Sequence, residues 1–431
     1  MTQRSAPDRS PSRVEQSLKR RYRAERRFRF YGQLAVAFGL AFVVLLFGSI
    51  FSKGYSAFEQ TYLKLSVYYD PEILDPNGTR KPEDLADADY GAIVKAALRV
   101  TAPDVESRSE LKELYGLVSN SAARALEARV KADPSLVGQR EAMWVLASDR
   151  VDQLLKGYIG RNEPEETRGV SNRQIGWIEG LKAGGVLEQR FNRKFFTAGD
   201  SREPEQAGVA GAVVGSFFTL IVTLCLSFPI GVAAAVYLEE FAPKNRVTDL
   251  IEVNINNLAA VPSIVFGLLG LAVCIQFFGM PRSVPLVGGL VLTLMTLPTI
   301  IIASRAALKS VPPSIREAAL GMGASRVQAI MHHVLPLAMP GMLTGGILGM
   351  ARALGESAPL LLIGMVAFIV DVPKRLTDPS TVLPVQVYLW ARSSERAFVE
   401  RTSGAIIILL VFLLVMNGLA VILRSRFERR W

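Results

Sequence analysis

The stretch Gly404–Leu423, GAIIILLVFLLVMNGLAVIL, decides the class of fold because none of its residues carries a charge. About 20 apolar residues in a helix cross the ~30 Å hydrocarbon core of a bilayer. A second run of this kind, Tyr31–Ser52, lies near the other end of the chain. Of the 431 residues, 50% are hydrophobic and 20% are charged. The sequence therefore predicts an integral membrane protein and excludes soluble globular, fibrous and disulfide-scaffold classes.

Six helical spans are predicted, so the expected fold class is an all-α integral membrane protein. Their approximate ranges are 31–52, 209–238, 257–279, 284–304, 337–357 and 404–423. A basic tail at 1–30 precedes the first span, an outer domain occupies 53–205, and the membrane core covers 206–430. Residues 334–370 would make a helix of about 55 Å, too long for one span, so we expect a break near Gly355 or Pro359.

Basic residues gather in three places: the tail at 1–30, the loop at 305–336 and the C-terminus after Leu423. Because cytoplasmic flanks of spans are enriched in Lys and Arg, all three are expected in the cytoplasm, with 53–205 outside. Residues 52–205 hold 25 acidic and 22 basic side chains, and the rest of the chain holds 14 and 27. A basic tail can also bind nucleic acid or anionic lipid. Beside a first span we favour an orientation signal and expect no nucleic-acid partner.

The outer domain at 53–205 is expected to be mostly helical. Ser107 with Glu110 and Ser171 with Gln174 have the spacing of capping boxes that open helices. A short alternation of apolar and polar residues at 63–67 is typical of a strand. No catalytic constellation is evident in this segment, which favours a structural or docking role.

A short cytoplasmic motif, PPSIREAALGMGASR at Pro312–Arg326, lies between the fourth and fifth spans. Two prolines suit its first turn, Ser314 with Glu317 has capping-box spacing, and Gly321 with Gly323 ends the helix in a turn. A short amphipathic helix held between two spans is a rigid knob. Such a knob can transmit force from a cytoplasmic partner.

This loop resembles the coupling loop of ABC importer permeases, which reads Glu-Ala-Ala, three residues, Gly, nine residues, Ile, one residue, Leu-Pro. His333 stands where that pattern has Ile. The resemblance implies a MetI-like permease fold of six helices, with the outer domain inserted between the first two, and insertion of the 317–323 segment into a cleft of a separate ATPase subunit. The matching positions are Glu317, Ala318, Ala319, Gly323, Leu335 and Pro336.

Residues 209–241 and 351–361 are similar to phosphate-specific permeases of the Pst type, most like their A subunit, here with an N-terminal extension. The resemblance implies a subunit that carries phosphate across the bacterial cytoplasmic (inner) membrane. The implied partners are two copies of a cytoplasmic ATPase, a second phosphate permease and a periplasmic phosphate-binding protein. A permease for another oxyanion, or a signalling or scaffold component of the phosphate system, remains the alternative.

Arg352 and Glu356 fall inside the fifth predicted span. An intramembrane charge costs roughly 2.5–3.5 kcal/mol on insertion scales and normally faces a bundle interior or a wet cavity. Residues i and i+4 share one face of a helix. One hypothesis is that Arg352 offers its planar donors to a passing phosphate while Glu356 limits how tightly it is held, with Arg305 at the inner mouth. The alternatives are a closed salt bridge, and an orientation anchor at Arg305.

The chain lacks a Gly-x-x-x-x-Gly-Lys-Ser/Thr phosphate loop. ATP hydrolysis would therefore belong to another polypeptide, and we expect no catalytic residues and no cofactor. The two histidines, His332 and His333, are adjacent and point to different sides of any helix. They make a poor metal pair, so no metal site is expected.

Overall fold

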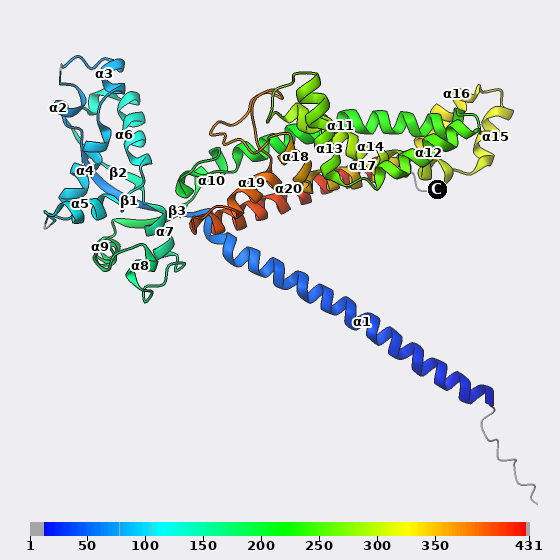
Figure 1. The fold of residues 1–431 in the computed structure, drawn as a ribbon, viewed down its shortest axis with the longest axis horizontal. Helices are drawn as coiled ribbons and strands as arrows, with labels where there is room; N and C mark the ends of the chain where they lie inside the picture. Colours follow the sequence, from blue (N-terminus) through cyan, green and yellow to red (C-terminus); the bar gives the residue numbers. More distant parts are fainter. Residues whose placement is uncertain (1–12, 77, 104, 428–431) are drawn as a thin grey trace, which may run out of the picture. The chain divides into compact units, whose positions relative to one another are not determined.

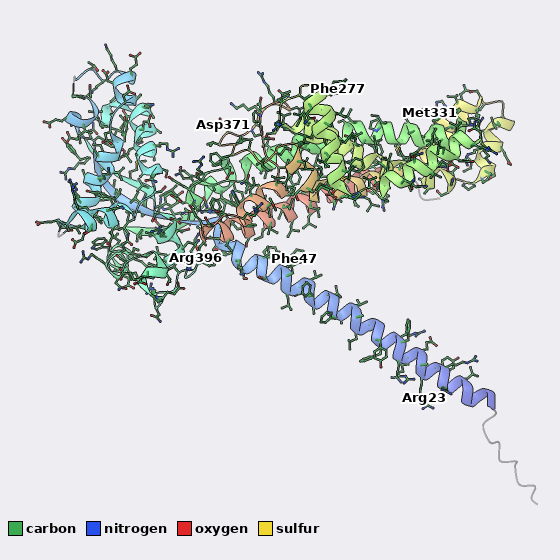
Figure 2. All side chains as sticks on the ribbon, in the orientation of Figure 1. Arg23, Phe47, Phe277, Met331, Asp371 and Arg396 are labelled. Carbon is green, nitrogen blue, oxygen red and sulfur yellow. The ribbon has the colours of Figure 1, made fainter. Side chains whose placement is uncertain are left out.

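The computed structural model describes residues 13–427 except 77 and 104 (Figure 1). The first twelve residues of the basic tail, with Arg429 and Arg430, lie outside the described residues. The chain divides into two compact units, 1–52 and 53–431. Helix α1 (Arg13–Gly54) holds the first predicted span, and its apolar side chains, Phe47 among them, are exposed (Figure 2).

The outer domain is built on a three-stranded antiparallel sheet in the order β2-β1-β3. Its strands are β1 (Glu59–Tyr68), β2 (Arg140–Leu146) and β3 (Leu187–Phe191). Its helices are α2 (Pro71–Leu74), α3 (Pro82–Ala86), α4 (Tyr90–Thr101), α5 (Arg108–Tyr115), α6 (Ser121–Ala132), α7 (Asp149–Leu155), α8 (Glu165–Arg168), α9 (Asn172–Ala183) and α10 (Arg193–Thr197).

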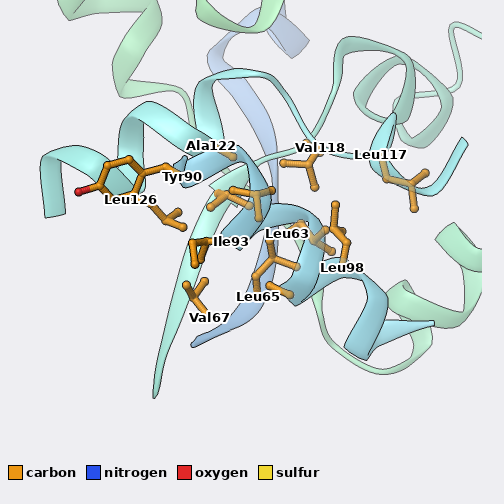
Figure 3. Packing of buried hydrophobic residues seen from close by; sticks show 14 of the residues in the cluster. Leu63, Leu65, Val67, Tyr90, Ile93, Leu98, Leu117, Val118, Ala122 and Leu126 are labelled. Atoms are coloured by element: carbon orange, nitrogen blue, oxygen red, sulfur yellow. The ribbon is translucent and has the colours of Figure 1, made fainter. Parts of the chain in front are cut away.

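The core of this domain lies between β1 and the helices that cover it (Figure 3). The alternating residues Leu63, Leu65 and Val67 are buried on one side of β1. Ile93 from α4 and Leu126 from α6 belong to the same cluster. Because side chains alternate across a strand, the short apolar repeat was sufficient to predict β1, and that prediction is confirmed.

Of the two helix caps predicted for this domain, one is confirmed and one is wrong. Ser171 and Gln174 form the predicted capping box at the start of α9. Ser107 does not cap α5, because its hydroxyl contacts the Ser109 hydroxyl at 3.0 Å instead. Strands β2 and β3 were missed: their side chains do not alternate between buried and exposed as those of β1 do.

The outer domain is joined to the last helix, α20 (Ala397–Phe427), by a buried charge cluster. The Lys156 ammonium lies 2.7 Å from the Asp152 carboxylate and 2.8 Å from the Glu400 carboxylate. It also donates to the Glu59 carbonyl at 2.8 Å, and the Gln153 amide donates to Glu400 at 2.5 Å. These charged side chains are only 2–4% exposed. We call Asp152, Lys156 and Glu400 the Lys156 cluster.

A second buried contact follows at the next residue of α20. The Arg401 guanidinium donates to the Ala57 carbonyl at 3.2 Å and to the Gln60 side chain, and it lies 5.7 Å from the centre of the Phe195 ring. Arg401 is 2% exposed. Both charges at the start of α20 therefore find partners in the outer domain, as buried charges require.

Within the described residues, the membrane core contains four long helices and several short ones. In chain order these are α11 (Ala210–Val236), a π-helical turn Tyr237–Phe241, α12 (Arg246–Ala259), α13 (Ser263–Gly270), a π-helical turn Leu271–Phe277, α14 (Pro285–Lys309), α15 (Pro313–Gly321), α16 (Arg326–Ala329), a π-helical turn Ile330–Val334, α17 (Leu335–Gly355), α18 (Ala358–Leu362), α19 (Leu383–Ala391) and α20. Helix α14 packs between α11 and α17 (Figure 1).

Within the described residues, five helices are long and apolar enough to cross a membrane, and a bent pair would make a sixth span. That pair joins α12 to α13 at an angle of 101°. The predicted third span, 257–279, is interrupted near its start: α12 ends at Ala259, and α13 begins after Pro262 at Ser263. The predicted break in the fifth span is confirmed, because α17 ends at Gly355.

Candidate functional site

The loop between α14 and α17 folds into two short helices, α15 and α16. Helix α15 ends at Gly321, and Gly323 turns the chain with a φ of +88°, a left-handed conformation that suits glycine. The predicted cap at Ser314 is wrong. Helix α15 begins at Pro313 with Pro312 as its N-cap, so Ser314 already lies inside the first turn, two residues after the capping position.

The segment expected to contact an ATPase is open to solvent. Glu317 and Ala318 are exposed, and Ala319 is buried against the protein. Leu320 and Met322 are 48% and 78% exposed. Val327 and Met331 extend this apolar surface; Met331 is labelled on the loop in Figure 2. An exposed surface with one acidic residue beside uncovered apolar side chains is suited to binding a protein partner.

The loop is held to the end of α11 through Glu240. The Arg316 guanidinium lies 2.6 Å from the Glu240 carboxylate. It also donates to the carbonyls of Val311 at 2.8 Å and Leu308 at 3.0 Å. Arg326 donates to the Glu240 carbonyl. We call Glu240, Arg316 and Arg326 the Glu240 cluster; it fixes the coupling helix relative to the preceding spans.

The adjacent residue, Glu239, takes part in a different set of ion pairs. Its carboxylate lies 3.3 Å from Arg305 and 3.6 Å from Lys309, both on α14. Arg305 also lies 2.5 Å from Glu252 on α12. Arg305 therefore joins three helical segments at this end of the membrane core. Its suggested part at the inner mouth of a pathway stays a prediction.

The second half of the predicted motif leads directly into α17. Leu335 is the first residue of this helix and Pro336 the second. The residues before them, Ile330–Val334, form a π-helical turn. His332 and His333 in that turn are exposed. The departure from the family pattern at His333 thus lies on the surface.

Helix α17 packs closely on α14 along a strip of glycines. A Cβ at Gly341 would lie 2.6 Å from the Ala307 Cβ, and one at Gly345 would collide with Ala303. Close approach of this kind requires small residues on both helices. The strip therefore places α17 firmly beside α14, and the polar end of α17 is positioned with it.

Arg352 lies in the last turn of α17, and Glu356 follows the break at Gly355. The Arg352 Nε lies 3.8 Å from a Glu356 carboxylate oxygen, a distance that allows ion pairing but no hydrogen bond. The two side chains are 43% and 22% exposed. Among the residues that the structure describes, no hydrogen bond from the Arg352 guanidinium is found. Its donors are therefore open to a ligand.

The ion pair that holds the loop, between Arg316 and Glu240, was not predicted from the sequence. Glu240 was visible only as one of two acids directly after an apolar span, and Arg316 only as a basic residue inside the motif. A charge at the end of a buried span usually needs a partner. That rule was the available signal, but it does not name the partner.

Comparison with known protein families identifies the general class of protein to which the chain belongs. Residues 227–431 match the family described as "Binding-protein-dependent transport system inner membrane component". Residues 15–165 match a domain of unknown function, DUF3333. The first match confirms the predicted helical permease fold.

Individual relatives narrow the class. The phosphate transport system permease protein PstA 1 of Mycobacterium tuberculosis is 31% identical over 229 residues, which cover 53% of this chain and 74% of that protein. PstA of Mycobacterium leprae is 32% identical over 232 residues, with 53% and 74% covered. The chain belongs to the PstA family of phosphate transport system permease proteins.

Two further similarities cover a smaller share of this chain. Probable ABC transporter permease protein YqgI of Bacillus subtilis is 34% identical over 187 residues, so the match covers 43% of this chain and 63% of that relative. A solved structure of the MetNI methionine ABC transporter in an inward-facing conformation is 19% identical, covers 50% of this chain and 95% of that chain, and gives a TM-score of 0.41.

Proposed function

We propose that this chain is the transmembrane permease subunit of an ABC importer that carries inorganic phosphate across the bacterial cytoplasmic membrane. The observation that carries the proposal is the exposed helix α15, with Glu317 and Met322 uncovered and its base fixed through Arg316 to Glu240. Membership of the PstA family supports phosphate as the substrate.

In this proposal the chain works as part of a larger assembly. Two copies of a cytoplasmic ATPase would power it, one docking on the 317–323 segment. A second phosphate permease would complete the translocation pathway, and an extracytoplasmic binding protein would deliver phosphate. The basic flanks of the spans support cytoplasmic termini, an extracytoplasmic domain at 53–205 and a permease core at 206–430.

Arg352 is proposed as the phosphate-binding group of the pathway. Its guanidinium is half-exposed and offers a planar fork that matches two phosphate oxygens. Glu356, 3.8 Å away, repels the anion and competes for the same guanidinium. A site that binds and also releases requires this balance. Arg305 is proposed to act nearer the cytoplasm, where its two carboxylate partners would tune its attraction for an anion.

Uptake of labelled phosphate by cells that lack the chain tests the substrate and the pathway. Arg352→Gln should lower complemented uptake at least tenfold while the protein still assembles. Arg375→Gln, in the exposed loop after α18, is the matched control and should transport normally. Normal uptake by Arg352→Gln would contradict the proposed role. Competition by sulfate or molybdate as strong as that by phosphate would favour a permease for another oxyanion.

Co-purification of the ATPase tests the coupling surface. Glu317→Lys reverses the exposed charge on α15 and should release the ATPase or abolish its stimulation. Asp249→Lys makes the same change on the exposed start of α12 and should leave the complex intact. Equal ATPase recovery with both variants would contradict the coupling-loop assignment.

A further inference from the structure

Three phenylalanine rings form a stacked column where the outer domain meets the membrane core. The Phe58 and Phe196 ring centres are 5.5 Å apart at an interplanar angle of 26°, and those of Phe196 and Phe191 are 5.4 Å apart at 11°. Phe195 meets Phe196 edge-on at 5.4 Å and is fully buried. We call Phe58, Phe196 and Phe191 the aromatic column.

The outer end of this column is uncovered. Phe196 is 37% exposed and Phe191 is 60% exposed. Single exposed aromatic residues are common, but stacked rings that share an uncovered face signal a surface that meets an apolar or amphipathic partner. On protein segments that lie at a membrane surface, exposed Trp, Phe and Leu side chains are buried in the boundary between the headgroups and the acyl chains.

The height of the column along the membrane normal follows from its contacts with α20. A Cβ at Gly404 would lie 2.7 Å from the Ala57 Cβ and 3.1 Å from the Phe195 ring. Gly404 is the first residue of the uncharged run Gly404–Leu423, and Arg401 precedes it by less than one turn. Through its edge-on contact with Phe195, the column therefore lies beside the residue at which the uncharged run of α20 begins.

The connection to α1 gives the same height. Gly54, the last residue of that helix, packs against α20: a Cβ there would lie 2.8 Å from the Ser403 backbone and 2.7 Å from Ile407. The uncharged run Tyr31–Ser52 ends two residues earlier. Phe58 follows Gly54 by one short 3-10 turn, so it too stands at the membrane surface.

Two basic residues lie close in sequence to the column, Lys53 before Phe58 and Arg193 after Phe191, as expected beside lipid phosphates. Lys53 and Arg193 are exposed, and neither forms an ion pair with another described residue. Lys and Arg beside aromatic rings are typical of the headgroup layer, where the ring contacts acyl carbons and the cation contacts phosphate.

We infer that the aromatic column is a lipid-binding surface that holds the near end of the outer domain's sheet in the phospholipid headgroup layer. Phe191 pairs with Glu59 at the near end of the sheet, whereas Tyr68 lies nine residues along β1, about 30 Å away. Only the near end would touch lipid. This inference does not depend on which solute the permease carries.

Spin labels test the inference in the full chain, in nanodiscs of phosphatidylethanolamine and phosphatidylglycerol. Cys225→Ser and Cys274→Ser remove the two native cysteines, and single labels are placed at Phe191→Cys, Phe196→Cys or Tyr68→Cys. Tyr68 is the matched control, an aromatic residue 44% exposed at the far end of the sheet. We expect the ratio of collisions with oxygen to collisions with a water-soluble nickel chelate to be at least threefold higher at 191 and 196 than at 68.

Two results would overturn the inference. Equal ratios at all three sites would mean that the column faces water, and protection from both reagents at 191 and 196 would mean that protein covers it. A second measurement retains an aromatic ring at each position. Phe196→Trp should add fluorescence that lipid brominated near its headgroup quenches at least twofold. The fluorescence added by Tyr68→Trp should not be quenched by the same lipid. Unquenched fluorescence from Phe196→Trp would also refute the lipid contact.

Discussion

Two charge clusters hold the membrane core at its two ends, and they are built differently. In the Lys156 cluster the paired side chains are 2–4% exposed, and one ammonium serves two carboxylates. In the Glu240 cluster Arg316 and Glu240 are 24% and 9% exposed, and the guanidinium also serves two backbone carbonyls. Buried charges are costly to separate, and Arg316 is more open to water than any member of the Lys156 cluster. The outer domain is therefore fixed to α20, and the coupling loop is held but able to adjust.

The largest effect is expected when the Lys156 cluster is broken. Lys156→Met leaves Asp152 and Glu400 buried without their cation, which costs about 3–5 kcal/mol of the free energy of unfolding. The melting temperature in detergent and the protease resistance of the outer domain should both fall. Lys131→Met removes an exposed pair with Glu127 instead and should cost only about 0.3 kcal/mol. Similar melting temperatures for the two variants would contradict the contrast between the clusters.

A pH dependence is expected from Glu205, which lies beside the same junction. Burial, with the nearby Asp149 and Glu203 charges, raises the pKa of Glu205 to about 7 from 4.5. Between these values the native protein keeps a proton that the unfolded chain has released. The free energy of unfolding therefore falls as pH rises from about 4.5 to 7.

Glu205→Gln should remove this penalty, which is on the order of 3 kcal/mol above pH 7. The variant should melt higher than the wild type at pH 8 and at the same temperature near pH 4. Glu166→Gln, on the exposed face of α8, is the control and should leave the profile unchanged. A wild-type advantage at pH 8 would show that the Glu205 carboxylate is stabilised, not strained, by its surroundings.

A smaller loss of stability is expected in the Glu240 cluster. Arg316→Ala removes a charged hydrogen bond to Glu240 and should cost about 2 kcal/mol, because water reaches the site. In the assembled transporter the change should also lower ATP-dependent uptake, since α15 loses its fixed base. Lys309→Ala, whose side chain is 59% exposed and 3.6 Å from Glu239, should alter neither property. Unchanged uptake with Arg316→Ala would mean that the loop does not need this contact.

Whether each local structure prediction was confirmed depends on how far its sequence pattern relies on distant residues. The strand at 63–67, the capping box at Ser171 and the break after Gly355 all express nearby chemistry, and all three are present. Ser107 and Ser314 have capping-box spacing, but the chain takes another course at each. A spacing rule describes which contact is available, and neighbouring contacts decide whether it forms.

The residues of the candidate site also divide into those predictable from nearby sequence and those whose contacts depend on distant parts of the chain. The exposed Glu317 and the Gly323 turn were predictable from the motif. The pairing of Arg316 with Glu240 was not, because 76 residues separate them. Arg305 was considered for the pathway, and only its carboxylate neighbours reveal that it also joins α12 to α14.

By itself the sequence determined the membrane class, the approximate spans, the coupling motif and the intramembrane Arg352 and Glu356. These features rest on apolar length, helical spacing and the cost of burying charge, which act over a few turns of chain. Only the tertiary structure decided that Lys156 meets Glu400, that Glu240 holds the coupling loop and that three phenylalanines stack at the membrane surface. Such contacts join residues far apart in the chain, so the packing of whole elements brings them together, and no local pattern records which partner each will meet.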